Sequence, residues 1–213
     1  MLKIDVLPVG VIGTCCYLVH DDTGEFLCMI DPGGDAEDIV KAASGIPAKK
    51  RYILLTHAHV DHISGVGGVA KAFPDAAVWV HPADREMYAS KDNALLPWLP
   101  AAKDLPEISA EVPQVPGMEI LDLPGHTQGG AGFYFPADKV LFAGDTIFAD
   151  SVGRTDLPGG DWDQLKNSIM QKIFTLPEDV QIYCGHGPST SVGIDYVYEK
   201  YGTGEQFVEK YGK

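Results

Sequence analysis

Short apolar runs bounded by glycine, aspartate and proline dominate the first part of the chain, a pattern typical of strands rather than of long helices. The sequence Asp-Asp-Thr-Gly separates two of these runs, as a hairpin turn would. We therefore expect strands at residues 2–9, 14–20, 26–30, 52–55 and 77–80.

Helix-like patterns lie between and after these strands. An Asp-Pro-Gly-Gly turn precedes residues 35–43, and a glycine-rich apolar stretch follows at 63–73. Further helices are expected after His81-Pro82, at 162–174 and at 189–199, with strands at 118–123, 132–135, 139–143 and 180–184. This order favours layers of helix flanking two sheets over an all-β barrel.

Residues 90–116 break this regular pattern because five prolines interrupt any long periodicity. The segment is either a folded loop over a pocket, with Trp98 in it, or a long connection. No linker divides the chain, so we expect a single domain spanning residues 1–213.

Composition narrows the choice of partners and compartment. Thirty acidic residues against 16 basic ones give a net charge of −14, so a nucleic-acid partner is not expected. Nor is a membrane partner, because no apolar stretch reaches about 18 residues. The amino-terminal residues lack a signal-peptide pattern. The four cysteines (Cys15, Cys16, Cys28, Cys184) lack zinc-type C-x-x-C spacing, which favours reduced thiols in the cytoplasm.

The densest chemistry lies in Thr56–His62, which reads T-H-A-H-V-D-H and directly follows an apolar strand. Three more candidates also follow predicted strands: a histidine in P-G-H-T, an aspartate in G-D-T and a histidine in G-H-G. Residues placed at strand ends can share one edge of a layered α/β fold. The candidate ligands are His57, His59, Asp61, His62, His126, Asp145 and His186.

Imidazole and carboxylate are ligands for zinc and other first-row divalent metals. Five histidines and two aspartates exceed the needs of one tetrahedral ion and suit two ions that share a bridging carboxylate. Zinc is the expected metal, with iron or manganese as alternatives. The alternatives without metal binding are a polar surface loop for the T-H-A-H-V-D-H segment and a helix cap for Asp145.

In this order, T-H-A-H-V-D-H, G-H-T, G-D-T and G-H-G resemble the metallo-β-lactamase fold superfamily over almost the whole chain. The resemblance implies a four-layer αββα sandwich of α/β (α+β) class, with the metals at one edge. It places His57, His59 and His126 on one ion, places Asp61, His62 and His186 on the other, and makes Asp145 the bridge. Asp61 and Asp145 would then act in catalysis as metal ligands that hold the hydroxide.

Within the superfamily, G-R-T-D-L-P-G-G-D at residues 153–161 is similar to short bacterial hydrolases related to glyoxalase II, which cleaves S-D-lactoylglutathione. The resemblance implies a thioester hydrolase whose partner is a small acyl thioester, with glutathione-derived compounds among the candidates. The C-terminal glutathione-binding helical domain of the longer enzymes is not expected here.

Two points stay open within this resemblance. Arg154 either binds a substrate carboxylate or pairs with a nearby acid such as Asp156. The activity is either hydrolysis or the iron-dependent chemistry of persulfide dioxygenases, which would use His57, His126 and Asp145. A hydrolase of a small ester or lactone is a further alternative.

Overall fold

The computed structural model describes residues 1–95 and 97–193. The chain forms two compact units, Met1–Pro116 and Gly117–Lys213. Each unit contains one five-stranded sheet of mixed direction. The expectation of a single domain remains a prediction.

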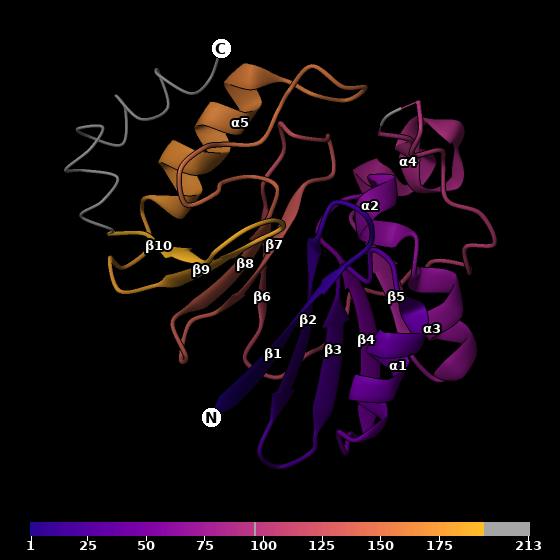
Figure 1. The fold of residues 1–213 in the computed structure, drawn as a ribbon. Coiled ribbons are helices and arrows are strands. Elements are labelled where there is room, and N and C mark those ends of the chain that lie inside the picture. Colours follow the sequence, from indigo (N-terminus) through magenta and orange to yellow (C-terminus); the bar gives the residue numbers. More distant parts are fainter. Residues whose placement is uncertain (96, 194–213) are drawn as a thin grey trace. The chain divides into compact units, whose positions relative to one another are not determined.

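The sheet of the first unit follows chain order from β1 to β5 (Figure 1). β1 (Leu2–Val9), β2 (Thr14–Asp21) and β3 (Phe26–Ile30) pair antiparallel, whereas β4 (Lys50–Leu55) and β5 (Ala77–Val80) run parallel to β3. The carboxyl ends of β3, β4 and β5 therefore meet at one edge. All five predicted strands are present, within two residues of the predicted bounds.

Helices α1 (Ala36–Ser44) and α3 (Val66–Ala72) pack on one face of this sheet. Their buried side chains Ile39 and Val69 join the alternating residues Leu27 and Met29 of β3 in one apolar core. Period-two alternation in a strand and a helical stripe can share a core in this way.

The predicted helix at 63–73 is wrong in its bounds. α2 (Val60–Ile63) begins inside the histidine motif, and α3 follows after a break at Ser64 and Gly65. The break arises because Gly65 N–H donates to the Pro32 carbonyl at 2.8 Å. A Cβ at Gly65 would lie 2.7 Å from that oxygen, so only glycine permits the approach.

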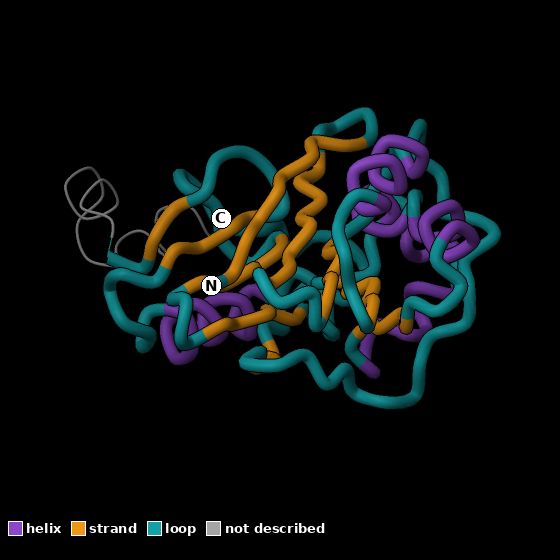
Figure 2. The backbone as a smooth tube through the Cα atoms, turned by 90° about the horizontal axis from the view of Figure 1, so that it is seen from below, coloured by secondary structure: helices purple, strands orange, loops and turns teal. Residues whose placement is uncertain are grey.

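The rest of the first unit is largely irregular. A 3₁₀ turn (Pro82–Asp84) leads into α4 (Arg85–Ala89), and another (Lys91–Asn93) follows. The described residues that follow within this unit, 94–95 and 97–116, are drawn as loop (Figure 2). Buried Asn93 accepts from Ala102 N–H at 3.0 Å, and Ser109 N–H donates to the Val78 carbonyl at 2.8 Å. These bonds hold the proline-rich segment against its own unit.

The second unit holds β6 (Glu119–Asp122), β7 (Ala131–Phe135), β8 (Val140–Gly144), β9 (Gln181–Cys184) and β10 (Thr190–Ser191) in the order β10-β9-β8-β7-β6. Among these described strands, β8 and β9 form the one parallel pair. The N-terminus of helix α5 (Trp162–Ser168) is capped by Asp161, whose carboxylate accepts from Gln164 N–H. Leu165 of α5 packs on Leu141 and Ile182 of the sheet.

The helix predicted at 162–174 is confirmed to within one residue, because α5 continues directly into a π-helical turn, Ile169–Ile173. A helix is expected at 189–199, but residues 190–191 form the strand β10. The part of this prediction from residue 194 onward lies outside the described residues. Among the described residues, no helix is long and apolar enough to cross a membrane.

The close approach of Gly33 to the histidine motif gives the first testable prediction. A Cβ at Gly33 would lie 1.7 Å from the Asp61 carbonyl oxygen, a backbone atom that cannot rotate away. Gly33→Ala should therefore lower the free energy of unfolding by roughly 1–3 kcal/mol, as overpacking does. Urea denaturation measures the change.

Gly45→Ala is the matched control for this substitution. Gly45 has a helical φ of −80°, and its nearest neighbour would be 3.7 Å from an added Cβ. Equal stability of the two variants would show that the turn at Gly33 can move away from the motif at no cost.

Candidate metal centre

The first unit gathers its polar residues where its parallel strands end. Asp31 follows β3, the motif Thr56–His62 follows β4, and Asp84 lies beyond β5. All four predicted ligands of the motif are buried, with exposed fractions of 2% for His57, 1% for His59, 5% for Asp61 and 0% for His62. A polar surface loop is therefore ruled out for this segment.

These four side chains also lie close together. The ring centroids of His57 and His59 are 4.8 Å apart, and those of His57 and His62 are 4.0 Å apart. The His62 Nε2 atom lies 3.3 Å from the Asp61 Oδ2 atom. Burying so many polar groups is costly unless they bind partners or a metal ion.

Asp31 organises this half of the site. Its Oδ1 accepts from Thr56 N–H at 2.7 Å, and its Oδ2 accepts from the Thr56 hydroxyl at 2.5 Å. His62 Nδ1 lies 2.9 Å from the same Oδ2. Because a carboxylate accepts, Nδ1 carries the proton and Nε2 carries the lone pair that a metal requires.

The same bonds set the tautomer of His57. The Thr56 hydroxyl donates to Asp31, so its oxygen accepts from His57 Nδ1 at 3.2 Å. His57 Nε2 then carries the lone pair. Ligand atoms of Asp31, His57 and His62 all lie within 4.8 Å of one another, a spacing that could hold a metal ion.

Two further residues support the motif in this unit. Asp84, 1% exposed, accepts from Ala58 N–H at 3.1 Å. The Thr14 hydroxyl lies 3.4 Å from Asp61 Oδ2.

Sequence reasoning missed Asp31, Asp84 and Thr14. Asp31 looked like a turn residue because proline and glycines follow it. The available signal was its place at the end of a buried strand, the same position that singled out the other candidates.

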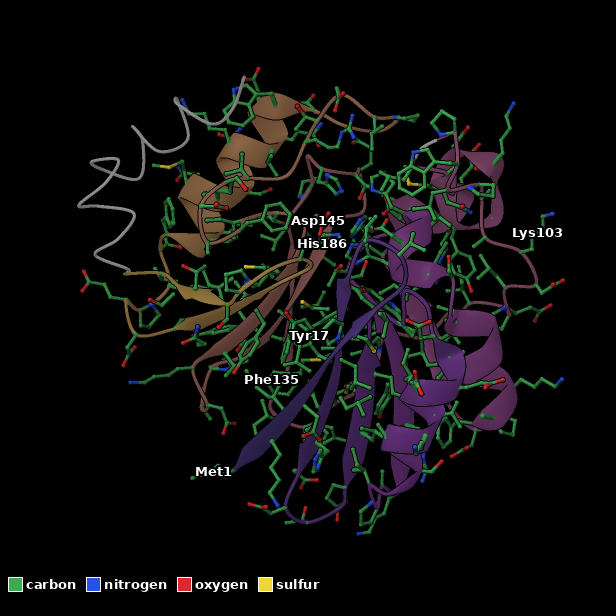
Figure 3. All side chains as sticks on the ribbon, in the orientation of Figure 1. Met1, Tyr17, Lys103, Phe135, Asp145 and His186 are labelled. Atoms are coloured by element: carbon green, nitrogen blue, oxygen red, sulfur yellow. The ribbon has the colours of Figure 1, made fainter. Side chains whose placement is uncertain are left out.

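The second unit carries the other three predicted ligands, each at or just beyond the end of a strand. His126 follows β6, Asp145 follows β8 and His186 follows β9. The Asp145 Oδ2 atom lies 3.7 Å from the Nε2 of His126 and 3.7 Å from the Nε2 of His186. Figure 3 labels Asp145 and His186 next to each other at one end of this sheet. One carboxylate oxygen thus faces two imidazole nitrogens.

The Gly-Arg-Thr-Asp loop, residues 153–156, fixes the ring of His126. The His126 Nδ1 atom donates to the Arg154 carbonyl at 2.7 Å, which again leaves the lone pair on the Nε2 atom. Gly153 is required here, since a Cβ would lie 1.9 Å from the Asp145 carbonyl oxygen. The Arg154 side chain holds Asp156 through two hydrogen bonds of 2.7 and 2.8 Å.

Of the two roles considered for Arg154, pairing with an acid is the one present. The hydrogen bonds from Arg154 lower the pKa of Asp156 to about 2. A contact between Arg154 and a substrate carboxylate remains a prediction.

The donor set fits first-row divalent ions. Each unit supplies buried or partly buried imidazoles next to a carboxylate, and three imidazoles have Nδ1 occupied by an oxygen partner. Such oxygen partners orient metal-binding histidines and raise their basicity. The division of the seven ligands between two ions remains a prediction.

Mixed sheets flanked by helices, with strand ends that carry histidine and aspartate, are typical of a class of metal-dependent enzymes. The chain belongs to the metallo-β-lactamase superfamily: the model of that superfamily matches residues 9–186. The predicted α+β class, with two mixed sheets flanked by helices, is confirmed.

Three similar proteins set this membership in context. Hydroxyacylglutathione hydrolase GloC of Haemophilus influenzae is 34% identical over 90% of this chain and 94% of its own. The structure of BLEG-1 B3 metallo-beta-lactamase has a TM-score of 0.80 and 33% identity, covering 96% of this chain and all of that one. The structure of TTHA1623 in a di-iron-bound form has a TM-score of 0.76 and 32% identity, and the match covers 90% of this chain and 96% of that one.

The Asp31 hydrogen bonds generate a second prediction. In Asp31→Asn, the amide NH₂ cannot accept, so Thr56 and His62 lose part of their support. Metal affinity should fall by about 10- to 100-fold, which is typical when a residue that orients a ligand is replaced. Competition with a chromophoric chelator measures it.

The control is Asp38→Asn, on the exposed face of α1. Unchanged affinity in Asp31→Asn, with changed stability only, would assign Asp31 to folding alone.

A third prediction concerns the pair of Arg154 and Asp156. Because the folded-state pKa of Asp156 is depressed, the pair stabilises the fold above about pH 3.8 and loses its effect as pH falls towards 2. The melting temperature of metal-free protein should therefore exceed that of Asp156→Asn at pH 6, and the gap should close on acidification.

The melting temperature of Arg154→Lys at pH 6 should lie closer to that of the wild type than the melting temperature of Asp156→Asn does. Lysine keeps the positive charge but loses the bidentate hydrogen-bond geometry of arginine. A gap that is independent of pH would exclude the ion pair as its source.

Proposed function

We propose that this protein is a metal-dependent thioester hydrolase of the glyoxalase II type. The reaction adds water to the acyl carbonyl and breaks the carbon–sulfur bond, releasing a carboxylate, a thiol and a proton. The observation that carries this proposal is the set of histidines and aspartates at strand ends in both units. The 34% identity to a relative named hydroxyacylglutathione hydrolase supports the substrate class.

The proposal keeps the ligand assignment made from the sequence. His57, His59 and His126 would hold one ion, Asp61, His62 and His186 the other, and Asp145 would bridge. The equal 3.7 Å distances from Asp145 Oδ2 to two imidazoles support the bridging role. When bound, two divalent ions would activate water and polarise the acyl carbonyl.

The chain's own residues prepare this chemistry before any substrate arrives. Asp31, Thr56 and the Arg154 carbonyl fix three imidazole tautomers, so no reorientation is needed on binding. Burial of the motif removes competing water.

Zinc remains the proposed metal, and the di-iron-bound form of a relative makes iron the first alternative. We also propose that the protein works in the cytoplasm. All four cysteines are buried as reduced thiols, which suits a reducing compartment.

A second candidate is β-lactam hydrolysis. It is favoured by the 33% identity and 0.80 TM-score to a structure titled a B3 metallo-beta-lactamase. The addition of water to a strained amide needs the same activated water and carbonyl polarisation. Persulfide dioxygenation is the oxidoreductase alternative, and the similar structure of ETHE1 from Myxococcus xanthus, at 22% identity, supports the fold alone.

The test is protein purified without added metal, analysed for metal content and assayed on S-D-lactoylglutathione, a β-lactam, a lactone and glutathione persulfide. We expect about two metal ions per chain and turnover of the thioester above the other substrates. Oxygen uptake with persulfide, or faster lactam opening, would replace the proposal with the corresponding alternative.

Asp145→Asn should abolish thioester turnover, lowering kcat/KM by more than about a hundredfold, because it removes the proposed bridging charge. Asp22→Asn, at a surface ion pair with Lys3, is the control and should retain full activity.

A further inference from the structure

A small cavity of about 200 Å³ lies beside Asp61 within the first unit. The turn between β1 and β2 forms one wall, the turn after β3 forms another, and Leu99 of the proline-rich segment completes it. Its lining residues include Val11, Ile12, Asp35, Asp61 and Leu99.

The wall formed by the β1–β2 turn is apolar and open to solvent. Val11 is 77% exposed and Ile12 is 36% exposed, although most large aliphatic side chains of this unit are buried. Adjacent exposed aliphatic side chains beside a candidate metal ligand are typical of a surface that a ligand covers.

This turn is held in place before any ligand binds. Gly10 N–H donates to the Asp35 carboxylate at 2.8 Å, and Gly13 N–H lies 3.4 Å from the Gly10 carbonyl. An added Cβ at Gly34 would lie 2.7 Å from Gly10 Cα, so the two turns touch through glycine backbone. Pre-organisation of this kind lowers the entropy lost on binding.

The charges around the cavity select among ligands. Its charged lining residues, within the described chain, are Asp35 and the proposed metal ligand Asp61. Because a bound metal ion would neutralise Asp61, the remaining charge is that of Asp35. Asp35 offers no partner to a substrate carboxylate, whereas an uncharged aliphatic group would meet Val11, Ile12 and Leu99. A volume of about 200 Å³ is below the ~300–1,000 Å³ of pockets for whole drug-sized ligands, so it suits one substituent of a substrate.

We propose that this cavity binds the acyl chain of the thioester substrate and that it selects short, uncharged aliphatic acyl groups. The inference rests on the proposed thioester hydrolysis. It assigns the acyl half of the substrate to the turn between β1 and β2 and to Leu99. The thiol half lies elsewhere.

The kinetic test measures kcat/KM on S-acylglutathiones from acetyl to octanoyl, which vary the chain and keep the thiol constant. We expect a rise of roughly fourfold per methylene while the chain fits, followed by a fall once it outgrows the cavity. In the double variant Val11→Ala with Ile12→Ala, the rise should flatten to about twofold or less per methylene.

Val6→Ala is the matched control, because Val6 is an exposed valine (47%) on β1 of the same hairpin, outside the cavity. It should keep the wild-type profile. Hydrolysis with no dependence on chain length, or a profile unchanged in the double variant, overturns the inference and leaves the proposed function intact.

A binding measurement distinguishes failure of the acyl-cavity inference from failure of the proposed thioester hydrolysis. S-butylglutathione, a thioether that cannot be hydrolysed, is titrated into metal-loaded protein with labelled methyl groups. We expect shifts of the Val11, Ile12 and Leu99 methyl resonances and none at Val6. Absence of these shifts while thioesters are hydrolysed overturns the inference alone, whereas absence of any thioester turnover overturns the proposed function and with it the assignment of the cavity to an acyl chain.

Discussion

The buried carboxylate of Asp31 is the interaction on which the first half of the site depends. It accepts from the backbone and hydroxyl of Thr56 and from the ring of His62, so one residue joins the ends of β3 and β4 to the first turn of α2. A carboxylate with 1% exposure is stable only when such donors surround it. The histidine loop therefore has a defined shape before a metal arrives.

The second unit also orients a histidine ring, but with a different kind of hydrogen-bond acceptor. There the acceptor that orients His126 is a backbone carbonyl, at Arg154, and the loop that carries it is closed by the pair with Asp156. Gly153 allows this loop to approach the Asp145 carbonyl, where any side chain would collide. In both units the imidazole is fixed through Nδ1, which presents Nε2 as the ligand nitrogen.

Much of this arrangement could be predicted from the sequence because strand ends carry the chemistry. The strands were found by apolar runs, and each ligand directly follows one. Where prediction failed, contacts distant in sequence decided the outcome. The helix predicted at 63–73 breaks at Gly65 because of the Pro32 carbonyl, and Asp31 looked like a turn residue because its partners lie 25 and 31 positions away.

The substrate was the least accessible property, and the reason is physical. Metal ligands need fixed residue types at strand ends, whereas an acyl cavity needs only aliphatic surface of the right size. In the sequence, Val11 and Ile12 stand between two predicted strands and Leu99 stands in the proline-rich segment, with no pattern that connects them. Only the fold brings the three to one cavity beside Asp61. Under the proposed acyl-binding role, specificity is therefore encoded by the spacing of turns, while the chemistry is encoded by residue identity.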